Sequence, residues 1–204
     1  MREHGASIGS WWLSELSTPA DLEERLLALG LGRVAGDYEL DAMLLTHEPP
    51  QGPPEVEARR VGSADEYAAA RLLQYEIFDS PAAHRRSGDE LRREFEAGAP
   101  GATYCAWLQG RLAATARAFF APQGAVLAGG ATAPWARGRG CYRALVRVRW
   151  DDLVSPGGGA LVVQAGAMSA PILRRLGFET VHRFHRLEDV LAPPPRPRGT
   201  RPGV

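Results

Sequence analysis

The apolar and polar positions of residues 56–190 alternate between two periods, which predicts a succession of strands and helices. Period-two alternation predicts a strand at 56–61, and apolar residues near helical spacing predict a helix at 65–78 with Ser63 as its N-cap. Further elements follow: a charged helix at 89–97, strands at 103–108, 112–120 and 125–133, a helix at 139–154, a strand at 161–164, a helix at 170–176 and a strand at 178–187. The order predicts an α/β (α+β) fold, a mixed central sheet with helices on both faces.

Two proline-rich runs divide the chain. Residues 49–54 read PPQGPP, which predicts a stiff linker, and residues 193–202 read PPPRPRGTRP, which predicts that 193–204 form a disordered tail. We therefore expect an N-terminal segment at 1–48, the linker at 49–54, the main domain at 55–192 and the tail.

The N-terminal segment contains a weak internal similarity. Residues 26–34 resemble residues 173–181, since each run is a helix end followed by Leu-Gly, a large apolar residue and a strand. Helix–glycine–strand junctions are common. The alternative is that 1–48 are the back half of a second, truncated copy of the fold. Because Trp11 and Trp12 need cover, we expect this segment to pack against the main sheet.

Composition excludes several classes of function. The 204 residues are 45% hydrophobic, and 24 basic residues balance 24 acidic ones, so no overall field draws the protein to nucleic acid or to a membrane. Every basic residue other than histidine is arginine, which excludes lysine Schiff-base and P-loop chemistry and indicates a GC-rich, bacterial coding bias. Two distant cysteines form neither a disulfide framework nor a zinc motif, and no segment is typical of a signal peptide or a membrane span. These features predict a cytoplasmic protein without a metal.

The clearest candidate for a ligand-binding motif is the segment after the strand at 125–133. Its loop reads Arg137-Gly138-Arg139-Gly140 and leads at once into the helix with Cys141 and Tyr142. Glycines let consecutive amides converge on one point, and the helix adds the positive end of its dipole. This pattern is typical of a phosphate or pyrophosphate site; the alternative is a plain strand–loop–helix junction that needs glycine for steric reasons. If the site binds pyrophosphate, Gly140→Asp is expected to lower the affinity by roughly a thousandfold.

With the strand at 161–164 and the later Leu176-Gly177-Phe178, this loop resembles the GNAT superfamily of acetyl-CoA-dependent acetyltransferases over about residues 56–190. The family signature is Gln/Arg-x-x-Gly-x-Gly/Ala. Arg137 and Gly140 fill its first two fixed places, and Tyr142 stands at the last, where a small residue is usual. The resemblance implies a mostly antiparallel sheet and acetyl-CoA (coenzyme A) as the cofactor.

The resemblance also implies where the cofactor binds. Backbone amides of Gly138, Arg139, Gly140, Cys141 and Tyr142, beside Arg137, would hold the pyrophosphate. Ala131, Thr132 and Ala133 would pair with the pantetheine arm, which would enter where their strand and the strand ending at Gln164 splay apart. Near helix N-termini and arginines a thiol pKa falls, but Cys141 is interpreted as a filler beside the cofactor.

The family's frequent catalytic residues are not matched. The strand at 125–133 contains no acid, and the usual tyrosine position is Leu173. Ser169, the predicted N-cap of the last helix, and Tyr142 are the candidates for protonating the thiolate, although capping and packing are the simpler roles. Proximity of amine and thioester would then supply most of the catalysis.

On the acceptor side, the resemblance places Tyr75, Glu76 and Asp79 beside the groove for the substrate amine. The function expected is an acyl-CoA-dependent N-acyltransferase that transfers acetyl to an amine by direct attack on the thioester. The alternative is a non-catalytic acyl-CoA-binding sensor or interaction module. We expect a small-molecule or peptide amine as partner, no nucleic acid or membrane, and a monomer or homodimer.

Overall fold

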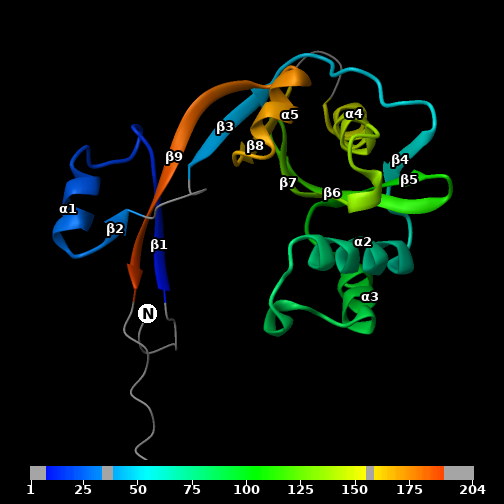
Figure 1. Cartoon of the computed structure of the whole chain (residues 1–204), viewed down its shortest axis with the longest axis horizontal. Helices are drawn as coiled ribbons and strands as arrows, with labels where there is room; N and C mark the ends of the chain where they lie inside the picture. Colours follow the sequence, from blue (N-terminus) through cyan, green and yellow to red (C-terminus); the bar gives the residue numbers. More distant parts are fainter. Residues whose placement is uncertain (1–7, 34–38, 155–158, 191–204) are drawn as a thin grey trace, which may run out of the picture. The chain divides into compact units, whose positions relative to one another are not determined.

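The computed structural model describes residues 8–33, 39–154 and 159–190 (Figure 1). The predicted tail at 193–204 lies outside these ranges. The chain divides into two compact units, one of residues 42–181 and one that combines residues 1–41 with 182–204. Each unit is described by itself.

The larger unit is built on a mixed sheet with the strand order β3-β8-β7-β6-β5-β4. Its strands are β3 (Leu40–Leu45), β4 (Val56–Arg60), β5 (Ala102–Leu108), β6 (Arg111–Ala121), β7 (Gly124–Thr132) and β8 (Ala160–Ala165). The pairs from β4 to β7 are antiparallel, and β7 pairs with β8 in parallel. The predicted fold class, mixed and mostly antiparallel, is confirmed.

Helices cover both faces of this sheet (Figure 1). On one face lie α2 (Ala64–Ile77) and α3 (Gly88–Glu96), and on the other lies α4 (Cys141–Leu153). Ser63 caps α2 as predicted, because its hydroxyl accepts from the Glu66 N–H, and Ser87 forms a capping box with Glu90 at α3. The short helix α5 (Ala170–Arg175) follows β8, and single turns occupy Ala82–His84 and Pro134–Ala136.

The core of the larger unit lies on both faces of the central strands. Alanines at 114, 116 and 118 keep one face of β6 thin, so that α4 approaches closely on that side. Tyr104, Leu145 and Leu161 are fully buried there. The strand β3 was not predicted, yet its Met43 and Leu45 are completely buried in the same cluster.

The predicted linker packs along α4. The Arg147 guanidinium donates to the Pro49 carbonyl oxygen at 3.1 Å and forms an ion pair with Glu48. A Cβ added to Gly52 would lie 2.6 Å from the Cβ of Ala144, so chain and helix are in close contact. Residues 49–54 therefore brace the helix instead of spanning a gap.

In the described part of the smaller unit, two strands pair with β9 (Glu179–Val190), whose first residues belong to the larger unit. β1 (Ile8–Leu13) and β2 (Gly32–Arg33) both pair with β9 in antiparallel fashion, and α1 (Leu22–Ala28) lies between them in sequence. Leu13, Leu26 and Leu187 form its buried core. Trp11 and Trp12 remain 44% and 43% exposed. The truncated second copy, and the packing of 1–48 on the main sheet, stay predictions.

Candidate functional site

The loop before α4 turns through two glycines with left-handed backbone. Gly138 has φ +73° and Gly140, the N-cap of α4, has φ +76°. Residues with a side chain rarely adopt this region, which explains why the sequence places glycine at both positions. The sharp turns let the chain enter a 13-residue helix directly.

The start of α4 presents unsatisfied backbone donors. No side chain caps the helix, and the first N–H groups of a helix have no intrahelical acceptor. Within the loop, the Arg137 N–H donates to the Pro134 carbonyl at 3.3 Å and the Arg139 N–H donates to the Ala136 carbonyl at 3.4 Å, whereas the N–H groups of Gly138 and Gly140 have no acceptor among the described residues. Arg137 and Arg139 are exposed on either side of Gly138 and form no ion pair with the described residues. Amides and guanidinium groups together fit a phosphate group.

Neighbouring atoms also require that residue 140 be glycine. A Cβ at this position would lie 2.4 Å from Cγ of Pro53, whereas one at Gly138 would meet no atom within 4 Å. The segment predicted as a linker thus closes the back of the turn. An acidic residue at 140 would combine strain, a clash and charge repulsion, so position 138 gives the cleaner test.

Beside this loop, β7 and β8 separate. Their parallel ladder comprises four pairs, from Gly124 with Ala160 to Leu127 with Val163. β7 continues for five residues beyond the last pair and β8 for two, ending at Ala165. The splayed strands expected from the sequence are therefore present within the larger unit.

The register of β6 and β7 shows which backbone groups face this opening. The Ala133 N–H donates to the Ala113 carbonyl at 2.9 Å, and Ala131 is paired with Thr115. Because antiparallel residues alternate in direction, Thr132 directs its N–H and C=O away from β6. Of the three residues expected to hold an extended ligand, Thr132 offers free hydrogen-bonding groups, and its two neighbours anchor it to β6.

A bulge in β7 lies on the same stretch. The β6–β7 register shifts between Thr115 and Arg117, opposite Gly129 and Gly130. Gly129 has φ +60°, and its carbonyl accepts a hydrogen bond from Gln74 Nε2 of α2 at 3.1 Å. Sequence reasoning missed Gln74, since a glutamine within a helical pattern gives no signal. Its side chain connects α2 to the bulged strand β7.

Tyr142 lies under β7. A Cβ on Gly130 would be 2.7 Å from Cε2 of the Tyr142 ring, and the Arg149 guanidinium carbon lies 6.0 Å from the ring centroid. The ring packs against the main core. The large residue in the family's small-residue position is thus accommodated by the glycine above it.

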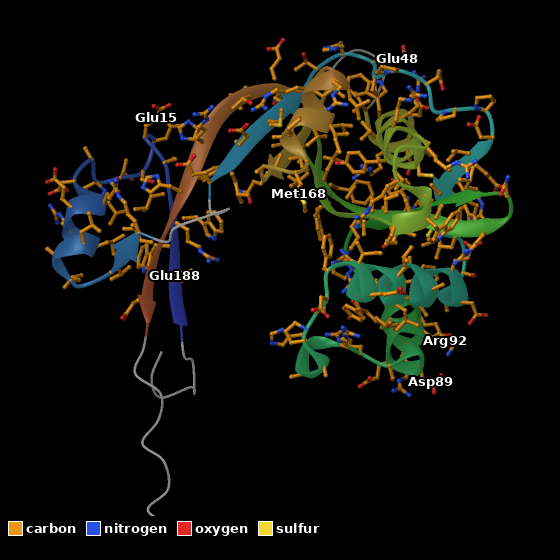
Figure 2. All side chains as sticks on the ribbon, in the orientation of Figure 1. Glu15, Glu48, Asp89, Arg92, Met168 and Glu188 are labelled. Carbon is orange, nitrogen blue, oxygen red and sulfur yellow. The ribbon has the colours of Figure 1, made fainter. Side chains whose placement is uncertain are left out.

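The other residues considered for catalysis are dispersed. Ser169 stands at the N-cap of α5, but its hydroxyl donates back to the Gly166 carbonyl at 3.3 Å. Gln164 is exposed near the end of β8, and Leu173 is completely buried. The turn between β8 and α5 also carries Met168, which is 87% exposed (Figure 2).

Burial outweighs the nearby features that would lower the pKa of the thiol beside the loop, in keeping with the interpretation of Cys141 as a filler. Cys141 is 1% exposed, and desolvation raises its pKa although a helix N-terminus and arginines are close. Cys105 is fully buried in β5, and burial raises its pKa to about 12. Neither cysteine is a nucleophile in this environment.

The residues expected beside the acceptor groove differ in exposure. Tyr75 is 8% exposed and packs in the cluster under α2, whereas Glu76 and Asp79 are exposed at the end of that helix. Asp79 has φ +45° and lies 3.7 Å from Arg85. An exposed pair of this kind contributes little to stability.

Among the described residues, no group of three or more His, Cys, Asp or Glu side chains could hold a metal ion. No described helix has the length and the apolar run that crossing a membrane requires.

Comparison with known proteins supports the fold. No protein-family model matches the sequence, and no curated protein matches it. Solved structures that resemble the chain include a GCN5-related N-acetyltransferase from Kribbella flavida (TM-score 0.62, 23% identity, 88% of this chain) and one from Sphaerobacter thermophilus (0.66, 17%, 89%). A tandem GNAT protein from the clavulanic acid biosynthesis pathway also resembles it (0.62, 19%, 92%).

The chain spans 67%, 59% and 65% of the length of these three proteins. It has the fold of the GCN5-related N-acetyltransferases, the superfamily that its sequence resembles.

Proposed function

We propose that the protein is an acyl-CoA-dependent N-acyltransferase that transfers an acetyl group to an amine. One observation carries the proposal: a turn with two left-handed glycines opens the uncapped helix α4 beside the unpaired end of β7. The first feature suits a pyrophosphate and the second suits an extended arm that binds like a strand. Acetyl-CoA contains both.

The chain's own residues would divide the work as follows. Amides of residues 138–142 and the exposed Arg137 and Arg139 would bind the pyrophosphate, while Thr132 would pair with the pantetheine arm. The amine nitrogen attacks the thioester carbonyl, the carbon–sulfur bond breaks, and coenzyme A leaves as the thiol after taking up a proton. Since β7 contains no acidic side chain, water removes the amine proton and the protein contributes proximity.

Gly138→Asp tests the phosphate site with little direct disturbance of packing. The new carboxylate would stand in open space at the turn, where it repels the ligand's phosphates. At about 4 Å and an effective dielectric near 20, the repulsion is roughly 4 kcal/mol, or close to a thousandfold in affinity. Calorimetric titration of coenzyme A into the wild type and the variant measures the change.

Two variants control for backbone strain. Gly138→Asn has the same shape without the charge, so it should lose far less affinity than the aspartate. Gly110→Asp places the carboxylate at φ +74° in the β5–β6 turn, again with no atom within 4 Å, and should bind like the wild type. If Gly138→Asp stays folded and binds within about threefold of wild type, the cofactor is not in this loop.

A non-catalytic acyl-CoA-binding module is the second candidate. It is favoured by the buried Leu173 at the family's tyrosine position and by the Ser169 hydroxyl, which is engaged with Gly166. Release of free coenzyme A from acetyl-CoA with a panel of amines separates the candidates. Tight binding without turnover for any amine would favour the module.

A further inference from the structure

A cluster of arginines lies on the opposite side of the sheet from α4. Arg71 belongs to α2, and Arg117 belongs to β6, where its partner residue on β7 is Ala128, next to the bulge. Burial lowers the pKa of Arg117, and the positive charge of Arg71 lowers it further. Two like charges therefore lie close together in a partly buried place.

The described residues do not satisfy these guanidinium groups. Nε of Arg71 and Nε of Arg117 are both buried without a hydrogen-bond partner. The bonds that do form are to neutral groups. Arg71 donates to Gln74 Oε1 at 3.0 Å and to the Tyr75 hydroxyl at 3.5 Å, and Arg117 donates to the Pro100 carbonyl at 3.3 Å.

The nearby carboxylate is already engaged. Glu94 of α3 forms an ion pair with Arg86 at 2.7 Å and also attracts Arg117, so one negative charge is shared among three local arginines. No described carboxylate forms an ion pair with Arg71 or Arg117. The cluster as a whole keeps an excess of positive charge, and like charges in a partly buried site are stabilised by an anion.

The position of the cluster connects it to the acyl site. Arg71 is hydrogen-bonded to Gln74, and Gln74 is hydrogen-bonded to the Gly129 carbonyl in the bulge of β7. Two hydrogen bonds and the width of one carboxamide place the Arg71 guanidinium within roughly 8 Å of that carbonyl. A small molecule could bridge this distance with an amine at one end and an anionic group at the other.

We propose that Arg71 and Arg117 bind a carboxylate of the acceptor, so that the substrate is a small amino acid and not a simple amine. This inference rests on the proposed function and names its substrate class. Guanidinium groups bind carboxylates in a geometry that ammonium groups do not match. The phosphates of coenzyme A are an unsuitable occupant, since their proposed site at α4 lies on the other face of the sheet (Figure 1).

The test compares acceptors that differ only in the carboxylate. Release of coenzyme A from acetyl-CoA is measured with the common L-amino acids and β-alanine, and with matched amines such as ethylamine for alanine and 2-phenylethylamine for phenylalanine. We expect turnover with at least one amino acid and at least tenfold lower kcat/KM with its matched amine.

Arg71→Gln and Arg117→Gln locate the effect. Each should raise KM for the amino acid by roughly tenfold to a hundredfold, the range expected for a lost charge-assisted contact, and leave KM for the amine unchanged. Arg92→Gln is the matched control, because Arg92 lies on α3 and is paired with Asp65 and Asp89 at the surface (Figure 2). Coenzyme A affinity should be the same in all three variants.

The outcomes distinguish a failure of the carboxylate site from a failure of the proposed acyltransferase function. Equal turnover of amines and amino acids, or variants that affect both alike, would overturn the carboxylate site and leave the acyltransferase proposal standing. No turnover with either class overturns the substrate assignment, and calorimetry with coenzyme A then decides whether the cofactor site fails too. If one arginine variant does not fold, the other still carries the comparison.

Discussion

The two faces of the central sheet offer different kinds of hydrogen-bonding groups to the ligands proposed for them. On the α4 face the groups available are backbone amides, held by two left-handed glycines and an uncapped helix. On the α2 face they are side chains, chiefly Gln74, Arg71 and Arg117. A backbone site depends on where the chain can turn, whereas a side-chain site depends on which residues the register brings together.

This difference has a consequence for how each face tolerates change. A backbone site is insensitive to most side chains but depends strictly on its glycines. A side-chain site can be altered one residue at a time, and its specificity can change while the fold persists. The predictions below test that contrast.

The largest expected effect is on folding at the α4 face. Gly140→Ala would place a methyl group 2.4 Å from Pro53 Cγ at φ +76° and should cost about 3 kcal/mol of unfolding free energy. Gly138→Ala has the same backbone strain without the clash and should cost about 1 kcal/mol. Urea unfolding of both variants measures the difference. Equal losses would mean that Pro53 does not brace the turn.

A smaller effect is expected where the two faces are connected. Gln74→Glu keeps an acceptor for Arg71 but loses the donor to the Gly129 carbonyl, so the bulge of β7 should loosen. Under the proposed function, kcat should fall about fivefold to tenfold with unchanged coenzyme A affinity. Amide hydrogen exchange at residues 129–132 should accelerate, a readout independent of turnover.

Leu72→Ala serves as the control, because Leu72 is 46% exposed on the same helix. If it changes exchange in β7 as much as Gln74→Glu does, the effect reports on α2 as a whole and not on the single hydrogen bond.

The smallest effect concerns pH at the start of α2. The hydrogen bond from Arg59, and then the Gly62 N–H, hold the pKa of Glu66 at about 2. A lowered carboxyl pKa stabilises the folded state above the unfolded pKa near 4.5, and this contribution is lost as pH falls toward 2. The melting temperature of Glu66→Gln should therefore lie a few degrees below wild type at pH 7, with the gap closing at pH 2. A gap that persists at pH 2 would assign the loss to something other than this charge.

The α4 face could be predicted from the sequence because its signals are local. Gly138 and Gly140 are only two positions apart in the chain, and the strand before them and the helix after them have clear periods. The elements around them were predicted to within three residues. The rise in the Cys141 pKa could not be predicted, because burial depends on neighbouring residues that only the fold brings together.

The α2 face could not be predicted in the same way. Arg71 and Arg117 are 46 positions apart, and only the placement of α2 under β6 brings them together. One signal was available: Arg117 is a lone charge within the apolar run of β6. The sequence does not predict strand β3, because Leu-Asp-Ala-Met-Leu-Leu follows neither the strand period of two residues nor the helical period. Its structure is decided by the burial of Met43 and Leu45, which depends on the tertiary fold.

Because the β7–β8 ladder ends before β7 does, the last part of β7 has an unpaired edge within the sheet. Five residues of β7 run on without a partner in β8, and Thr132 among them directs its peptide groups outward. Open edges recruit other extended chains, so in the absence of a ligand this stretch is where association with a second strand, native or foreign, would begin. Under the proposed function, a bound pantetheine arm would act as the missing strand and protect the edge, so added coenzyme A is expected to slow aggregation.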